Sequence, residues 1–243
     1  MGYGFSFNGH HCSEFGLAVK NRNRQLLPAV NDRYLEIPGR HGSYHFPGEL
    51  QDRVIELECA FMGASRENLR EKAREIAAWF YTKEKAVLSF DDEPGKYYYA
   101  KLDGAIDTEQ LSVLATFSLV FRCEPLAYGE DEEVFFEGNT ALVNNQGTFE
   151  ALPVFSATFT STASEWKVSL GTKYIRVVHS FQVGDTLEVN CATGAVLING
   201  GRALDKLDWQ NSEFFALPPG ENTLAITPTG ICTAMVTFKP RWL

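Results

Sequence analysis

Signatures of several common functional classes are missing from this 243-residue sequence. The five cysteines are odd in number and form no CxxC pair, which leaves zinc-ribbon and thioredoxin-like sites without support. We expect these widely spaced cysteines to be reduced thiols in a protein made in the cytoplasm. No apolar run approaches about 18 residues, so no membrane-spanning helix is expected. The motifs GxxxxGK(S/T), GxGxxG and GxSxG are also absent, so no motif indicates an enzyme or a cofactor.

Basic charge is scarce as well. The chain has 22 Lys and Arg against 31 Asp and Glu, a net charge of −9. Residues 1–128 hold 15 basic and 18 acidic side chains (−3), and residues 129–243 hold 7 and 13 (−6). Neither half has the basic field that tight nucleic-acid binding needs. An acidic surface instead suits a protein past which DNA slides without sticking.

One segment, residues 65–83, has the 3.6-residue periodicity of an amphipathic helix. Its apolar stripe consists of Leu69, Ala73, Ile76, Ala77 and Phe80. Ser65 suits the N-cap, and Lys83 and Lys85 suit the negative C-terminal end. The pattern predicts a helix that covers one face of a sheet.

Most of the remaining sequence alternates between apolar and polar residues. Ile55 to Phe61 alternates with Glu56 and Glu58, and residues 113–121 follow the same period of two. DDEPGKYYY (91–99) predicts a turn that joins strands 85–90 and 96–102. The sequence therefore predicts a mainly β fold of half-buried antiparallel strands.

The composition changes at CEPLAYGEDEEVFF, where Pro125, Gly129 and an acidic run interrupt the periodic pattern. We place a boundary near 128–134, which gives domains of residues 1–130 and 131–243. Beyond it, short strands recur every 8–12 residues between turns, and no convincing helix occurs. That spacing is typical of a sandwich or a jelly roll.

The loop EIPGRHGSYHFPGE (36–49) concentrates polar and turn-forming residues, and on its own it fits an active site, a metal clamp, a phosphate cradle or a contact surface. His41 and His45 are four residues apart, as in zinc hydrolases, but Gly42 and the flanking prolines disfavour the required helix. The nearby HHC at 10–12 adds no ligand-type spacing. A phosphate cradle would precede a helix, whereas a strand follows here. The residues alone leave an active site and a contact surface open.

Two further functional classes have weaker support. Trp166, Trp209 and Trp242 offer a sugar-stacking platform, although aromatic residues in a β-sandwich more often belong to the core. A pair of glycosidase carboxylates cannot be selected from 31 acidic residues by sequence alone.

Six segments carry a resemblance that covers most of the chain. They are IPGRHGSYHFPG before a strand, the helix 65–83, the strand LSVLATFSLVFRCEPLAYG, and the later INGGR, LPPGENTLAI and VTFKPRW. In their order and spacing they resemble the distal tail protein (Dit) family of long-tailed phages and Gram-positive prophages.

The resemblance implies an N-terminal β-barrel or sandwich with one amphipathic helix, related to tail-tube proteins. It also implies a C-terminal galectin-like (jelly-roll) β-sandwich. Six N-terminal domains would form a homohexameric ring that continues the tail tube and lets DNA pass. This hub would join the tail tube protein to the tail-associated tip protein and to receptor-binding or adhesin proteins. It would lie at the virion tail tip after assembly in the host bacterial cytoplasm, without specific nucleic-acid binding and without a membrane.

Within this frame, Arg40, His41 and Tyr44 are predicted ring contacts, since Arg and Tyr are favoured at interfaces. No residue is assigned to catalysis, a cofactor or a metal. The alternative function is a carbohydrate-binding adhesin module, and a wall-degrading enzyme comes third. Galectin sugar sites cluster His, Asn, Arg and Trp, whereas residues 150–243 contain the single His179 and no matching cluster in the sequence.

Overall fold

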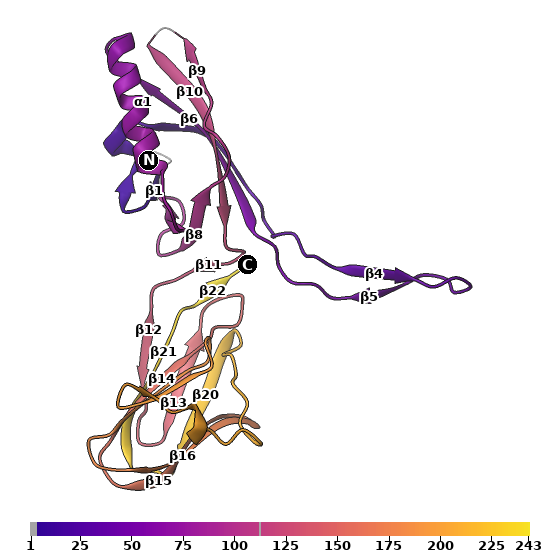
Figure 1. The fold of residues 1–243 in the computed structure, drawn as a ribbon, viewed down its shortest axis with the longest axis vertical. Coiled ribbons are helices and arrows are strands. Elements are labelled where there is room, and N and C mark those ends of the chain that lie inside the picture. The colour runs from indigo at the N-terminus through magenta and orange to yellow at the C-terminus, as the bar shows by residue number, and fades with distance from the viewer. Residues whose placement is uncertain (1–3, 112) are drawn as a thin grey trace. The chain divides into compact units, whose positions relative to one another are not determined.

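The computed structural model describes residues 4–111 and 113–243. The fold is mainly β with one α-helix, as the sequence predicts, and it consists of two compact units (Figure 1). The first unit ends at Tyr128 and the second comprises Gly129–Trp242. Among the described residues, no helix has the length and apolar character needed to cross a membrane.

A twisted antiparallel sheet forms the body of the first unit, with strand order β2-β1-β7-β8-β10-β6-β3. β9 pairs with β10, and β11 pairs with β8. The strands are β1 (Phe5–Phe7), β2 (His10–His11), β3 (Ala18–Arg24), β6 (Arg53–Met62), β7 (Ala86–Phe90), β8 (Tyr97–Leu102), β9 (Thr108–Leu111), β10 (Leu114–Cys123) and β11 (Ala127–Tyr128). A short 3-10 helix, η1, spans Cys12–Phe15.

The long strands β6 and β10 pair in full register, with Leu57 opposite Leu119 and Ile55 opposite Phe121. These four side chains are buried, while Glu56 and Glu58 face solvent. The period-two prediction for both segments is therefore confirmed. The turn predicted at 91–99 also joins β7 to β8.

The helix α1 (Arg66–Phe80) begins where predicted, because the Ser65 hydroxyl accepts the Asn68 amide at 3.2 Å. It ends at Phe80, so the prediction that the helix reaches residue 83, with Lys83 and Lys85 at its negative end, is wrong. Ala77 is exposed and Trp79 is buried in its place.

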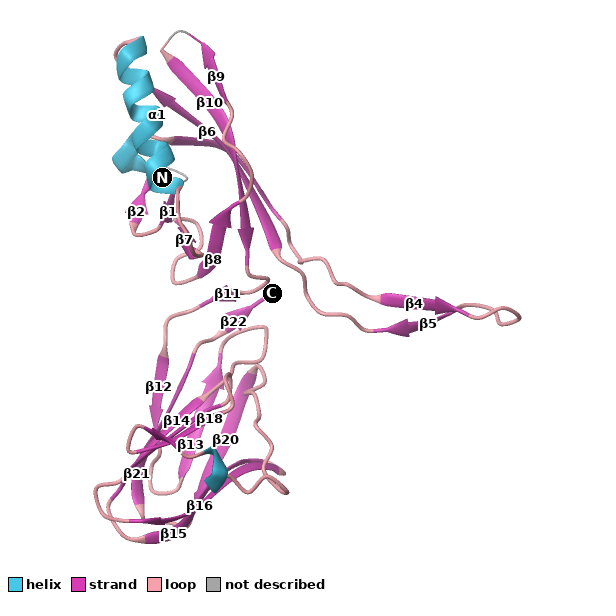
Figure 2. Cartoon of the chain, viewed as in Figure 1, coloured by secondary structure: helices cyan, strands magenta, loops and turns pink. Residues whose placement is uncertain are grey.

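An aromatic cluster fastens α1 to the sheet (Figure 2 shows the helix against one face). Trp79 stacks on Phe5 with ring centroids 5.7 Å apart, and its indole N–H donates to the Phe7 carbonyl at 2.8 Å. Phe80 meets Phe121 edge-on at 6.0 Å. Within residues 4–111 and 113–243, α1 is the one α-helix, so no α-helix covers the opposite face of β3, β6 and β10.

The second unit is a β-sandwich. A six-stranded sheet has the order β12-β21-β14-β17-β18-β19, and a four-stranded sheet has the order β13-β20-β15-β16. The strands are β12 (Glu132–Phe135), β13 (Thr140–Asn145), β14 (Val154–Phe159), β15 (Ala163–Leu170), β16 (Lys173–Phe181), β17 (Thr186–Asn190), β18 (Ala195–Ile198), β19 (Gly201–Arg202), β20 (Gly220–Thr227), β21 (Cys232–Phe238) and β22 (Arg241–Trp242). A single 3-10 turn, η2 (Leu204–Lys206), interrupts the β-structure of this unit.

Both sheets contribute to one apolar core, in which Phe159 and Phe181 stack at 3.9 Å. Trp166 is fully buried in this core, so it cannot belong to a surface platform with Trp209 and Trp242. The five cysteines are free thiols. Burial raises the pKa of the Cys59 and Cys123 thiols to about 12, as expected for inert core residues.

Candidate assembly arm and its anchor

Residues 25–52, called the arm below, leave the sheet between β3 and β6 and return as a long two-stranded ribbon (Figure 1). β4 (Arg33–Glu36) pairs with β5 (Ser43–Phe46), and an isolated bridge joins Val30 to Leu50 nearer the sheet. All eight residues of β4 and β5 are exposed. A two-stranded ribbon is marginally stable by itself in water.

One face of the arm is apolar. Arg33 lies opposite Phe46 and Leu35 lies opposite Tyr44, so the period of two places these side chains on one face. Leu35 is 51% exposed and Phe46 is 52% exposed. Large apolar side chains left in water at these positions indicate a contact surface.

The other face of the arm is polar and internally paired. Tyr34 lies opposite His45, and their rings stack with centroids 5.1 Å apart. The Asp32 carboxylate accepts the Gly48 amide at 2.8 Å and lies 3.0 Å from His45 Nε2. The Gly48 hydrogen bond, followed by that of His45, holds the pKa of Asp32 below its usual range. These contacts stiffen the ribbon and leave the apolar face open.

The three predicted contact residues lie at or next to the tip of the arm. Arg40 places its guanidinium 3.8 Å from the centre of the Tyr44 ring, a cation–π contact. His41 is exposed between Arg40 and Gly42 in the tip turn, where Gly39 and Gly42 have positive φ. The structure thus brings Arg40 and Tyr44 together, on the face that also carries Leu35 and Phe46.

His41 and His45, which were considered as a zinc pair, do not share a helix face, because His45 belongs to β5 and His41 to the turn. In the HHC segment, His10 pairs with Glu14 at 2.9 Å, and Cys12 is buried with its pKa raised by burial. Within residues 4–111 and 113–243, no group of three or more His, Cys, Asp or Glu side chains is arranged to hold a metal ion.

The root of the arm is held by Arg53, which is only 5% exposed. Its guanidinium donates to the Gln25 carbonyl at 2.7 Å and to the Pro125 carbonyl at 3.1 Å. The Gln25 side chain in turn accepts the Val54 amide at 3.2 Å. The first residue of the arm is thereby tied to the start of β6, where the chain returns to the sheet, and Arg53 also ties this point to the segment after β10.

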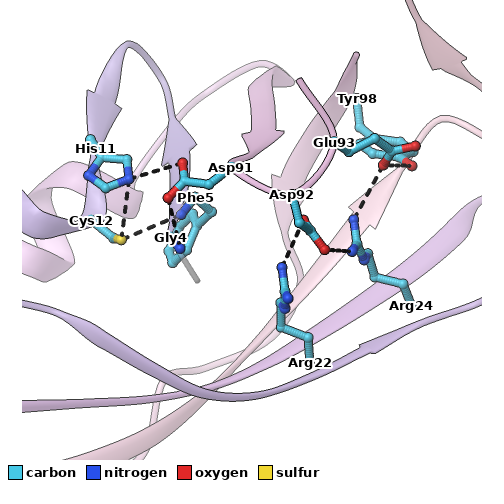
Figure 3. A network of polar contacts seen from close by, with 10 residues as sticks. All are labelled: Gly4, Phe5, His11, Cys12, Arg22, Arg24, Asp91, Asp92, Glu93 and Tyr98. Carbon is cyan, nitrogen blue, oxygen red and sulfur yellow. Dashed lines mark hydrogen bonds and ion pairs between the residues drawn. The ribbon is translucent and has the colours of Figure 1, made fainter. Parts of the chain in front are cut away.

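A second clamp joins β3 to the turn between β7 and β8 (Figure 3). Arg22 and Arg24 lie opposite the buried Leu57 and Ile55, so their side chains start from the core-facing side of β3. Arg22 approaches Asp92 at 2.8 Å, and Arg24 reaches both Asp92 and, at 3.3 Å, Glu93. The clamp fixes the strand that leads into the arm.

Tyr98 completes this clamp by donating its hydroxyl to Glu93 at 3.1 Å (Figure 3). Burial, followed by the Glu93 charge, raises the pKa of Tyr98 to about 12, so the hydroxyl remains a donor at neutral pH. Burial raises the pKa of Asp92, but Arg24 and Arg22 outweigh that effect and leave it below its usual range.

The same turn also holds the N-terminal strand (Figure 3). The Asp91 carboxylate accepts the Gly4 amide at 2.9 Å and approaches His11 Nε2 at 3.3 Å. A Cβ at Gly4 would lie 2.4 Å from the His11 ring and 2.5 Å from the Asp91 carboxylate, so a larger residue here would displace these two side chains. Three consecutive acidic residues therefore bind the N-terminal segment, the arm root and Tyr98.

The uncovered sheet face of the first unit is polar. The rows Asn21–Glu58–Ser118 and Asn23–Glu56–Val120 run across β3, β6 and β10. Shallow hollows lie along these rows, extended by Lys20, Asp107 and Glu109. This face presents amides, hydroxyls and carboxylates, together with the basic residues Lys20 and Arg122, of which Arg122 is paired with Asp103 at 2.7 Å.

Sequence reasoning missed the clamp at the arm root. No role was predicted for Arg22, Arg24 or Arg53. The acidic partners of Arg22 and Arg24, and the Pro125 carbonyl that accepts from Arg53, are about 70 residues away along the chain. The alternation NRNR at 21–24 was the available signal, because it places both arginines on one face of a strand.

Two family models match the chain. The phage tail protein RIFT-related domain matches residues 10–123, and the siphovirus-type tail component C-terminal domain matches residues 146–242. The distal tail protein of Bacillus phage SPP1 is 24% identical over 224 residues, which cover 89% of this chain and 88% of that protein.

A solved structure shares this fold. The crystal structure of SPP1 Dit, presented as a paradigm of the hub adsorption apparatus in phages that infect Gram-positive bacteria, matches with a TM-score of 0.86 at 18% identity, covering 100% of both chains. A chain of the phage p2 baseplate in its activated conformation with Sr matches with a TM-score of 0.48 at 8% identity, covering 97% of both chains.

Proposed function

Because this chain belongs to the distal tail protein (Dit) family of siphovirus-type tail components, we propose that it builds the hub ring at the distal end of a phage tail. Its role is structural and involves no catalysis. In this proposal six copies form a homohexameric ring that joins the tail tube protein to the tail-associated tip protein and to receptor-binding proteins. The ring lies in the virion tail and is assembled in the host bacterial cytoplasm.

The arm is the observation that carries the ring proposal. Its apolar face leaves Leu35, Tyr44 and Phe46 about half exposed, and its two-stranded ribbon has no sheet of its own to lie on. In an assembly of identical copies, each arm can contact the same surface of a neighbouring copy. A head-to-tail contact of this kind closes into a ring when the rotation between copies allows it.

Arg40, His41 and Tyr44 are the proposed ring contacts at the end of the arm. The Arg40–Tyr44 stack presents a cation and an aromatic ring together, a pairing that is favoured at interfaces. The clamp of Arg22 and Arg24 on Asp92 fixes the strand from which the arm leaves, which reduces the conformational entropy lost when a neighbour binds.

The polar face of β3, β6 and β10 is the proposed lining of the ring channel. Its exposed Glu56 and Glu58 repel phosphate groups, which lets DNA pass without being held. Residues 1–130 would form the ring, and residues 131–243 would form a galectin-like sandwich that faces the host-adsorption apparatus.

The ring proposal is tested by light-scattering mass across concentration, followed by negative-stain images of the heaviest species. We expect a concentration-dependent species of six copies with a central hole. Arg40→Glu should lower the fraction of this species while leaving the circular dichroism and the unfolding midpoint unchanged. Arg202→Glu, the same charge reversal at an exposed residue of β19, is the matched control.

A ring fraction in Arg40→Glu equal to that of the control would contradict the assigned tip contact. A wild-type protein that stays monomeric at every concentration, alone and with purified tail-tube protein, would contradict the ring itself.

A further inference from the structure

Two edge strands of the second unit separate after the turn that joins them. β12 lies at one edge of the six-stranded sheet and pairs with β21, while β13 lies at one edge of the four-stranded sheet and pairs with β20. In the turn, the Glu137 amide donates to the Thr140 carbonyl at 2.8 Å, and the reverse bond measures 3.3 Å. Beyond this pair the strands enter different sheets, and the described residues show no further pairing between them.

The register shows which backbone groups of β12 are left open. In an antiparallel ladder, successive residues alternate between exchanging hydrogen bonds with a neighbouring strand and facing away from it. The Phe136 amide donates to the Ala234 carbonyl of β21 at 2.9 Å, so the even-numbered residues of β12 form the hydrogen-bonded pairs with β21. The backbone groups of Glu133 and Phe135 therefore face away from β21, in the same direction as those of Glu137.

The same alternation holds for β13. The Ile226 amide donates to the Asn139 carbonyl at 2.7 Å, so the odd-numbered residues pair with β20. The backbone groups of Leu142 and Asn144 therefore face away from β20. These open edges of β12 and β13 are called the seam below. Open strand edges are templates for a further strand.

Large apolar side chains flank the seam. Phe135 is 67% exposed and Leu142 is 63% exposed. Their neighbours along each strand pack into the core of the sandwich, so Phe135 and Leu142 belong to the outward half of each alternating strand. Apolar contacts beside an open edge give an added strand its specificity, in addition to the hydrogen bonds of its backbone.

The seam is also acidic. Residues 129–145 contain five Asp and Glu and no Lys or Arg, and the exposed Glu221 lies opposite Asn144. Asp131 is paired with Lys239 at 3.5 Å. Within the described part of the chain, Glu133, Glu137 and Glu221 form no ion pair. Their charges are therefore open to basic groups of another molecule.

The charge of the seam disfavours a second copy of this chain as its partner. Two identical seams would bring like charges together, which is how natural edge strands avoid pairing with themselves. The arm is acidic as well, with two Arg against four Asp and Glu in residues 25–52. A basic segment of a different protein has the complementary charge.

We propose that the seam binds an extended basic segment of a partner protein, which adds as a strand beside β12. The backbone of the segment would pair with Glu133 and Phe135, and its apolar side chains would contact Phe135 and Leu142. Its Lys or Arg side chains would pair with Glu133 and Glu137. This inference goes beyond the hub role and does not depend on ring formation.

Fluorescence anisotropy with the full chain tests the seam. The probe is a labelled heptapeptide of alternating lysine and valine. One comparison peptide has the same sequence with every backbone nitrogen methylated, so that it cannot donate to a ladder, and the other alternates glutamate and valine. We expect the lysine peptide to bind, less tightly as salt rises, and both comparison peptides to bind about tenfold more weakly or not at all.

Hydrogen exchange locates the added strand. The Glu133 and Phe135 amides should exchange more slowly when the lysine peptide is bound, because their N–H groups face the seam. Phe135→Ala and Glu133→Lys should each weaken binding about tenfold. Glu188→Lys is the matched control for charge, because Glu188 is an exposed carboxylate on β17 of the same sheet, away from β12. It should bind as the wild type does, and ring formation should be unchanged in all three variants.

No binding of the lysine peptide would overturn the proposal. Equal losses in Glu133→Lys and Glu188→Lys would also overturn it, because net charge alone would then hold the peptide. Binding that leaves exchange at Glu133 and Phe135 unchanged would show that no strand is added at β12 and would be equally contrary.

Discussion

At the scale of single residues, the arm depends on a few charged side chains that neutralise one another at its root. Asp92 accepts from Arg22 and Arg24 in a partly buried position. Removing one member of such a group leaves its partners without compensation. The stability that the first unit loses at low pH should therefore include a contribution from the Asp92 carboxylate.

We expect Asp92→Asn to make stability less dependent on acid. The two arginines lower the folded-state pKa of Asp92, so its contribution to stability is complete above the unfolded value of about 3.9 and is lost as pH falls through the lower, folded value. Urea unfolding at pH 7, 5 and 3 should show a lower midpoint for the variant at pH 7. It should also show a smaller loss than wild type between pH 5 and pH 3.

Asp107→Asn, which removes the same charge from an exposed loop before β9, is the control for this experiment. Equal acid sensitivity of wild type and Asp92→Asn would mean that the clamp adds nothing to stability.

Single-residue roles were the least accessible to sequence reasoning. The buried position of Trp79, in place of the predicted Ala77, reflects how the end of α1 lies against Phe5 and Phe7. The position of Trp79 depends on strands that are far away in sequence, and the apolar periodicity of the helix alone does not predict where those strands lie. Likewise, Asp208 and Arg176 come together through the pairing of residues 207–213 with β16, which no spacing in the sequence indicates.

At the scale of elements, prediction was more successful because the signals are local. The alternation in β6 and β10 arises from the geometry of a single strand, and the start of α1 arises from one hydroxyl. The end of α1 was predicted too late, because Lys83 and Lys85 are as compatible with the loop after a helix as with its C-terminal end. The sequence predicted turns at residues 36–49 but not the long ribbon. Every residue of β4 and β5 is exposed, so these strands have no buried face to produce a clear alternation of apolar and polar residues.

The N-cap of α1 offers a test at this scale. Ser65→Ala removes the acceptor for the Asn68 amide, and we expect the free energy of unfolding to fall by about 1 kcal/mol. Ser65→Asp keeps an acceptor at the cap and should stay close to wild type. Urea titrations followed by circular dichroism measure both. A loss in Ser65→Asp as large as in Ser65→Ala would show that the hydroxyl acts through something other than the cap.

At the scale of the whole molecule, the net charge of −9 and the polar sheet face support the same function. A channel for DNA must avoid the phosphate contacts that basic residues make. Glu58 is exposed on β6 beside Asn21 and Ser118, and Glu56 lies next to Asn23. Both carboxylates project from the uncovered face, where Glu56 accepts a long hydrogen bond from Asn23 at 3.4 Å.

Reversing these two charges should therefore create DNA binding without unfolding the protein. We expect the wild type to leave duplex DNA unshifted in a gel assay at about 0.15 M salt, and Glu56→Lys with Glu58→Lys to shift it. The new binding should weaken steeply as salt rises, because each lysine–phosphate contact releases counterions. Glu71→Lys with Glu75→Lys, on the exposed side of α1, makes the same charge change away from the proposed channel. If both double variants shift DNA equally well, net charge alone controls binding. That result would contradict the proposal that this sheet face lines the channel.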